Sequence, residues 1–277
     1  MRRLSLRAMA IILICSFATL ISSCASSKRE YDYSWVADNK YIAHACGEID
    51  GYVYTNSREA LEENYAKGYR VFEVDIMWTS DRKLICWHGW SDPVVFDLIP
   101  EEYQCKDVSY DEFMDMEMAG GLHTMDLAYL INFMAEHPDM YVVTDTKSIY
   151  DDLNQLLFED IYEEAESIAP ETLDRFIPQI YYEGMLDIIN EIYPWKSIIY
   201  TLYLVPAGTT FDDIVKFARK SGVRVITTFP DGGLNDDFLA DLNKYDIYVY
   251  LHTFNDESET VQWVDKGVEG FYTDCLI

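Results

Sequence analysis

The sequence predicts an α/β fold, a closed (β/α)8 TIM barrel with a small insertion after the second strand. Short apolar runs alternate with helical patterns from Tyr41 to the end of the 277-residue chain. Eight of these runs qualify as strands, and the span they occupy is close to the roughly 250 residues typical of such a barrel. The expected strands are 41–46, 70–77, 140–147, 175–182, 197–204, 224–229, 247–254 and 269–276.

The first crossover is predicted as a helix over 56–68, NSREALEENYAKG. Asn56 is expected as its N-cap, Glu59 as the second half of a capping box, and Gly68 as its terminator. A later helix is predicted over 210–222 from the common face of its apolar residues. No internal repeat or low-complexity segment interrupts the alternation.

One further apolar run, KLICWHGW at 83–90, does not qualify as a barrel strand. A parallel neighbour needs a crossover of a dozen or more residues, and the link TSDRK is far too short. We expect the run to fold back on the second strand as a hairpin arm. Residues from about 89 to 124 are then an insertion at the barrel mouth.

The composition bounds the partners of the chain. It is 49% hydrophobic and 25% charged, with a formal net charge of -28 at pH 7. These values suit one large globular domain or two small ones, and they leave the oligomeric state open. A surface this acidic repels phosphate backbones, so nucleic acid is not expected as a partner.

Residues 1–24 predict an export signal. Arginines precede an apolar run that is too short for a comfortable membrane span, and small residues follow it. The closing ISSC resembles a bacterial lipobox, so we expect lipidation of Cys24 and a membrane-anchored lipoprotein of the cell envelope, outside the cytoplasm. An ordinary signal peptide is the alternative. Residues 25–39 are expected to be a tether and 40–277 the folded domain.

Cysteine spacing argues against a zinc site, because no CxxC pair occurs. Cys46 and Cys275 fall at the ends of the first and last predicted strands, which are neighbours in a closed barrel. A disulfide between them and free buried thiols both remain open.

The second strand carries two carboxylates in an apolar setting, Glu73 and Asp75 in VFEVDIM. Residues two apart project to the same side of a strand, and barrel enzymes keep their chemistry at the carboxyl ends of the strands. Paired carboxylates repel each other and lose hydration, and a divalent cation relieves both costs. The alternatives are an exposed pair between helices or a structural ion pair with a basic residue.

Other polar residues follow strands at the same predicted end: His44, Asp145 and Lys147, with His88 on the hairpin. Imidazoles titrate near neutrality, so His44 is expected as general base and His88 as general acid. Lys147 can offset charge on a substrate oxyanion. Aromatic residues on the strands and hairpin either line the pocket or pack in the core; they include Trp90, Tyr181 and Tyr203.

Taken together, YIAHACG, TNSREALEENYAKGYRVFEVDIMWTSDRKLICWHGW, VVTDTK, YLHTFND and KGVEGFYTDC resemble the glycerophosphodiester phosphodiesterases, from about residue 40 to the end. The resemblance implies hydrolysis of small phosphodiesters, or lipid head groups, to an alcohol and a phosphomonoester in lipid metabolism. It further implies residue roles: Ca2+ or Mg2+ ligands at Glu73, Asp75 and Asp145, catalytic histidines at His44 and His88, and a phosphate contact at Lys147.

Three departures from the family pattern stand out. Ala45 replaces an arginine that contacts phosphate. The missing contact costs roughly 1.5–3 kcal/mol of phosphate-binding free energy, which Arg58 or Arg82 would have to offset. Asp145 replaces a glutamate, and His252 replaces an aromatic pocket residue. Asp-x-Lys also resembles the sphingomyelinase D phospholipases, whose lyase-like chemistry is one alternative. A catalytically weak lipid-anchored binding protein, suggested by Ala45, is another.

Overall fold

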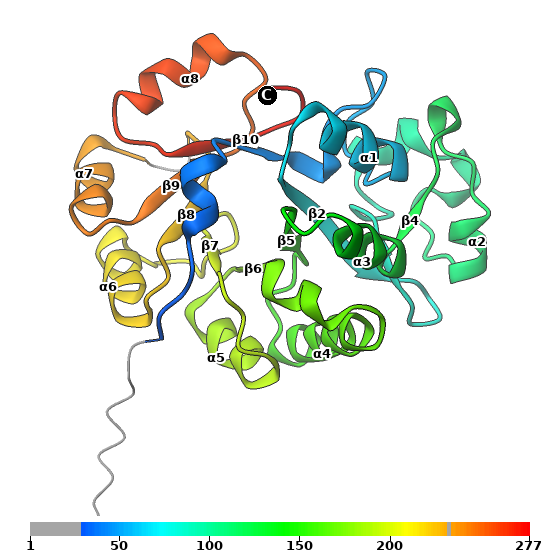
Figure 1. Ribbon diagram of the computed structural model, residues 1–277, viewed down its shortest axis with the longest axis horizontal. Helices are drawn as coiled ribbons and strands as arrows, with labels where there is room; N and C mark the ends of the chain where they lie inside the picture. The colour runs from blue at the N-terminus through cyan, green and yellow to red at the C-terminus, as the bar shows by residue number, and fades with distance from the viewer. Residues whose placement is uncertain (1–28, 232–233) are drawn as a thin grey trace, which may run out of the picture.

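The computed structural model describes residues 29–231 and 234–277 (Figure 1). Parallel pairing runs from strand to strand around the sheet, and it closes where the first strand pairs with both the second and the last. This is the predicted eight-stranded barrel. Its strands are β1 (Tyr41–Ala43), β2 (Val71–Trp78), β5 (Tyr141–Asp145), β6 (Phe176–Ile180), β7 (Ile199–Thr201), β8 (Val225–Thr228), β9 (Tyr248–Leu251) and β10 (Gly270–Thr273).

Helices surround the barrel, as Figure 1 shows. The helix predicted over 210–222 forms with Thr210 as its N-cap, in a capping box with Asp213, and with Gly222 as its C-cap at φ 93°. The outer ring consists of α1 (Arg58–Lys67), α3 (Leu127–Glu136), α4 (Asp151–Ile168), α5 (Glu183–Ile192), α6 (Phe211–Ser221), α7 (Asp236–Lys244) and α8 (Glu257–Val264), with the 3-10 helix η6 (Pro170–Arg175) leading into β6. None of the helices in the described ranges is long and apolar enough to cross a bilayer.

The hairpin and the insertion are where the sequence predicts them. β3 (Leu84–Cys86) runs antiparallel to the second half of β2, and β4 (Met125–Asp126) runs antiparallel to β3. The insertion lies beyond α1 and α3 at one side of the barrel (Figure 1). It contains η3 (Pro93–Leu98), η4 (Glu101–Tyr103), α2 (Tyr110–Met114) and η5 (Ala119–Gly121).

Trp90 belongs to the core of this insertion. Its ring lies 5.4 Å from that of Trp87 and edge-on to Phe113, and it is 3% exposed. It therefore packs under the hairpin, and it is not a wall of an open pocket.

Several strands are shorter than predicted because the backbone turns sharply at their carboxyl ends. The first strand ends at Ala43. The 3-10 helix η2 (His44–Cys46) follows it and contains Ala45 at φ 45°. β5 ends at Asp145, and Lys147 lies at φ 50°. These turns leave the polar side chains on the rim instead of continuing the sheet.

The predicted N-cap of the first helix is wrong by one residue. Ser57 caps α1 by accepting a hydrogen bond from the Ala60 N–H, and Glu59 binds His123 instead of completing a capping box. Asn56 is thereby free for another role, described below. Gly68 ends the helix at φ 124°, as predicted. Cys46 and Cys275 are both free thiols, so the disulfide is not formed.

The residues before β1 close the floor of the barrel. The 3-10 helix η1 (Ser34–Asp38) buries Trp35, whose indole N–H donates to Ser197 Oγ at 2.9 Å and whose ring packs on Tyr250. Tyr33 donates to the Ile198 carbonyl at 2.9 Å. Ser197 and Ile198 precede β7, so these contacts lie at the amino ends of the strands.

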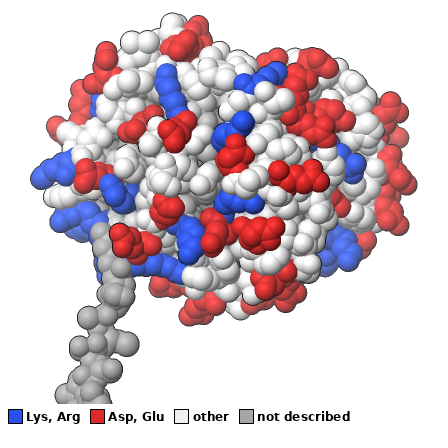
Figure 2. Space-filling model, in the orientation of Figure 1, with Lys and Arg blue, Asp and Glu red and all other residues white. Residues whose placement is uncertain are grey.

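The predicted tether, 25–39, is therefore too long, because folded structure begins by Tyr31. The aromatic residues of this stretch are buried instead of solvated. On the face drawn in Figure 2, acidic side chains are widespread and several basic ones gather where the described chain begins.

Replacing Trp35 with alanine should lower the free energy of unfolding by roughly 3–5 kcal/mol, because a buried indole and its hydrogen bond are lost together. Chemical denaturation measures the change. Tyr150→Ala, at a site 65% exposed, is the control and should shift stability by no more than about 0.5 kcal/mol. Equal stability of the two variants would show that the floor segment does not stabilise the barrel.

Candidate active site

Three carboxylates meet inside the carboxyl end of the barrel. Glu73 and Asp75 project together from β2, and Asp145 is the register partner of Asp75 on β5. One oxygen from each lies within 4.8 Å of the other two, and all three side chains are buried. The inward orientation is therefore correct, and the exposed pair between helices is excluded.

Backbone and amide donors hold the two acids of β2. The Ala45 N–H donates to Glu73 Oε2 at 2.7 Å. Asn56 donates from Nδ2 to Asp75 Oδ2 at 2.8 Å and accepts from the Asp75 N–H at 3.2 Å. Both Ala45 and Asn56 lie in the left-handed region, at φ 45° and 44°, which turns them toward the acids. Asn56, predicted as a helix cap, is therefore a residue of the site instead.

A pair of tyrosines positions the third acid. Tyr181 and Tyr203 both donate to Asp145 Oδ1, Tyr203 at 2.8 Å. The Tyr181 hydroxyl also accepts the N–H groups of Thr146 and Lys147, each at 2.9 Å. With Oδ1 engaged in this way, Oδ2 is the oxygen that faces Lys147 Nζ, at 3.6 Å. The two tyrosines hold Asp145 in place.

Electrostatics at the three acids are unbalanced. Lys147 pairs with Asp75, and although burial opposes it, the charges of Asp75 and Asp145 keep the lysine pKa above its ordinary value. Burial, and then the Asp75 charge, raise the pKa of Glu73 to about 8. A carboxylate that retains its proton near neutrality reflects a deficit of positive charge. The donor set is hard oxygen, which suits a divalent cation.

The two histidines differ in environment. His44 Nδ1 lies 2.9 Å from Asp274 Oδ1, and Asn255 holds that carboxylate through Nδ2 at 2.6 Å. Burial lowers the pKa of His44, but Asp274 and Glu73 outweigh it and raise the value to about 9. Burial lowers the pKa of His88, and its nearest acid, Asp92, is 3.4 Å away. His44 therefore favours the charged form and His88 the neutral form.

The family model of the Glycerophosphoryl diester phosphodiesterase family matches residues 49–276. The chain belongs to this family. His44 precedes the matched span, and Glu73, Asp75, His88, Asp145 and Lys147 fall within it. No curated protein sequence gives a significant match.

Solved structures of similar fold carry the same family names. A glycerophosphodiester phosphodiesterase from Parabacteroides distasonis superposes with a TM-score of 0.66 at 15% identity, over 85% of this chain and 92% of its own. A phosphodiesterase from Oleispira antarctica, in complex with the product sn-glycerol-3-phosphate, superposes with a TM-score of 0.66 at 14% identity, over 85% of this chain and 93% of its own. A glycerophosphodiester phosphodiesterase from Thermotoga maritima superposes with a TM-score of 0.59 at 15% identity, over 85% of this chain and 94% of its own.

Membership makes the protein a glycerophosphodiester phosphodiesterase by family, and nothing in the comparisons supports the sphingomyelinase D-like lyase or the weak binding protein.

The family arginine missing at Ala45 is not replaced by either of the two arginines expected to offset it. Arg58 donates to the Thr124 carbonyl at 2.9 Å, and Arg82 pairs with Asp160 at 3.2 Å. Across the described ranges, Lys147 is the lysine or arginine paired with the acidic triad.

His252, at the family's aromatic position, is a buried and uncharged residue that packs among aromatic rings. Its ring stacks on Tyr272 at 4.0 Å and stands edge-on to Tyr203 at 6.0 Å. Burial, with a smaller effect of His44, lowers its pKa to about 3. The ring is therefore neutral near pH 7, and it contributes apolar contact area instead of charge.

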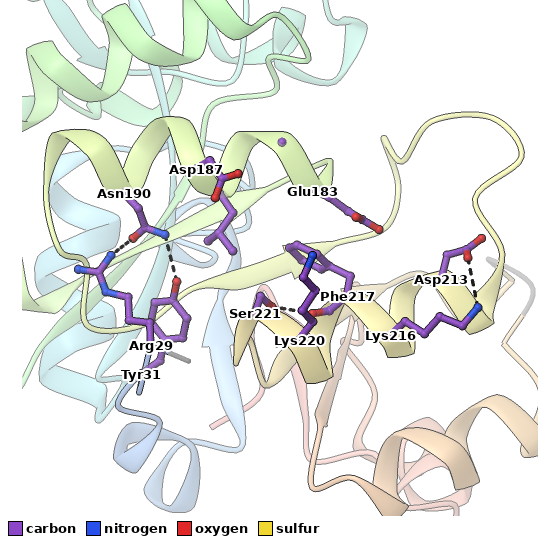
Figure 3. A pocket seen from close by; sticks show the side chains of 12 residues that line it. Arg29, Tyr31, Glu183, Asp187, Asn190, Asp213, Lys216, Phe217, Lys220 and Ser221 are labelled. Carbon is purple, nitrogen blue, oxygen red and sulfur yellow. Dashed lines mark hydrogen bonds and ion pairs between the residues drawn. The ribbon is translucent and has the colours of Figure 1, made fainter. Parts of the chain in front are cut away.

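A groove of about 660 Å³ lies elsewhere, between α5 and α6 (Figure 3). Lys216 on one side pairs with Asp213 at 3.7 Å, and Asn190 on the other donates to Tyr31 at 3.1 Å. It shares no residue with the acidic triad.

Removing the Tyr203 hydroxyl with Tyr203→Phe should weaken divalent-cation binding about 10-fold, because ligands that lose an outer hydrogen bond typically lose 10–100-fold in affinity. Calorimetric titration with CaCl2 and with MgCl2 measures it. Tyr200→Phe is the matched control, since that buried tyrosine packs on Phe217. Unchanged affinity in Tyr203→Phe would show that Asp145 needs no such support.

Proposed function

We propose that this protein hydrolyses small glycerophosphodiesters to an alcohol and a phosphomonoester, with Ca2+ or Mg2+ held by Glu73, Asp75 and Asp145. The observation that carries the proposal is the convergence of three buried carboxylates and two unlike imidazoles at one end of a barrel of this family. The likeness to a structure that holds sn-glycerol-3-phosphate supports the substrate class.

The residues fit a divalent cation by their chemistry. Three carboxylate oxygens lie together out of water, Lys147 is the basic side chain paired with them, and burial and the Asp75 charge raise the pKa of Glu73. A cation bound there would polarise a phosphoryl oxygen and make phosphorus more electrophilic.

Acid and base roles follow from what holds each histidine. Asp274, itself fixed by Asn255, supports a charged His44, so His44 is placed to protonate the leaving alkoxide. His88, which favours the neutral form, can take the proton of the attacking water. This reverses the roles expected from the sequence. Lys147 offsets charge on the phosphoryl oxygens.

Substituting either histidine should lower turnover sharply. His44→Ala and His88→Ala are each expected to reduce kcat on glycerophosphoethanolamine by about 100-fold or more, the usual contribution of a general acid or base. Excess EDTA should abolish activity, and CaCl2 or MgCl2 should restore it.

His123→Ala serves as the control, because that histidine is 71% exposed and pairs with Glu59. Turnover within twofold of wild type in both site variants would rule out the mechanism. A cyclic phosphate product in phosphorus NMR would indicate attack by a substrate hydroxyl instead of water.

We also propose that the chain is exported and lipidated at Cys24, which lies outside the described residues. The support is the sequence pattern of residues 1–24. Cys24→Ser should move the protein from the membrane fraction to the soluble fraction of a bacterial host, and it should abolish labelling by a clickable palmitate. Cys105→Ser, which changes an exposed thiol of the folded domain, should leave both unchanged. Membrane recovery of Cys24→Ser would contradict the proposal.

A further inference from the structure

The loop between β1 and α1 contains an unusual tyrosine. Tyr54 lies at φ 61°, in the left-handed region, as do Asp50 and Asn56 of the same loop. Aspartate and asparagine tolerate this conformation, whereas it is rare for a bulky side chain such as tyrosine. Such strain persists when the surroundings hold it, and it concentrates at functional sites.

The surroundings of Tyr54 do hold it. On one side, Ile49 and Tyr52 exchange backbone hydrogen bonds across a tight turn, at 2.9 and 2.8 Å. On the other, the Asn56 N–H donates to the Ala45 carbonyl at 3.2 Å, and its side chain is bound to Asp75. The backbone is therefore held on both sides of Tyr54, and on the Asn56 side it is held to the acidic centre.

The Tyr54 ring lies between the two imidazoles. Its centroid is 4.6 Å from that of His44 and 5.0 Å from that of His88, edge-on to each. The residue is partly exposed, so the ring forms part of the mouth. Burial, and then the charges of Asp274 and Glu73, raise its pKa, as expected for a phenol beside the acids.

We propose that Tyr54 is a specificity-determining residue of this site, and that its ring restricts the leaving alcohol to a small one such as ethanolamine. The inference rests on the proposed function. A diester that engages both His44 and His88 has to place its phosphoryl group beneath or beside this ring. A short chain can lie along the ring, whereas a cyclic alcohol such as inositol meets its edge.

The experiment compares kcat/KM for glycerophosphoethanolamine and glycerophosphoinositol in four proteins: wild type, Tyr54→Asn, Tyr54→Phe and Tyr54→Trp. Asparagine keeps the left-handed backbone while removing the ring. It should raise the inositol-to-ethanolamine ratio about 10-fold, a typical size for relief of one steric contact in a pocket. Phenylalanine should leave the ratio unchanged, and tryptophan should lower it.

Tyr52→Ala is the matched control. It removes an equally large ring from the same loop, one that packs against Gly120 and away from the imidazoles. Its ratio should equal that of wild type. Circular dichroism verifies folding, and if Tyr54→Asn does not fold, the tryptophan and phenylalanine variants decide. A ratio within twofold of wild type in every folded Tyr54 variant, with ethanolamine release intact, overturns the inference alone. Absence of diester cleavage by metal-loaded wild type overturns the proposed function itself.

Discussion

Excess negative charge in a confined space is the constraint on which the rest of the site depends. Three carboxylates share a volume in which their oxygens lie within 4.8 Å of one another, and Lys147 is the cation that contacts two of them. Such an arrangement is unfavourable in a folded protein unless donors surround it or a metal enters. The Ala45 N–H, the Asn56 amide and the two tyrosine hydroxyls are the donors that make it tolerable.

The same constraint explains where the backbone is strained. Ala45, Tyr54, Asn56 and Lys147 all adopt positive φ, and all lie on the rim, where each turns a donor or a ring toward the acids or the imidazoles. Strain of this kind costs on the order of 1–3 kcal/mol per residue and must be offset elsewhere. The packed floor supplies part of that stability, with Trp35 against Tyr250 beneath the strands. Part of the stability that offsets this strain thus comes from the opposite end of the barrel.

Much of this could be predicted from the sequence, because some signals are local and periodic. The two-residue repeat of strands places Glu73 and Asp75 on one side, and the short link after β2 forces a hairpin. His44, His88, Asp145 and Lys147 follow from their position at strand ends. Asn56 could not be assigned in this way, because asparagine is a favoured helix cap and its amide also donates hydrogen bonds to a carboxylate.

Other features have no local signal. The left-handed conformations of Ala45 and Tyr54 are set by tertiary contacts. Alanine and tyrosine have no preference for this backbone conformation, so the sequence does not indicate it. The contact of Asn255 with Asp274, and of Tyr203 with Asp145, joins residues far apart in the chain. The aromatic residues before Lys40 read as a tether because the surface they cover exists only after the barrel has closed.

The course of that floor segment has a consequence for orientation. It crosses the amino ends of the strands, whereas the acids and imidazoles occupy the carboxyl ends, so the chain enters the domain on the side opposite the opening. A domain held by its N-terminal side turns its opening away from whatever holds it.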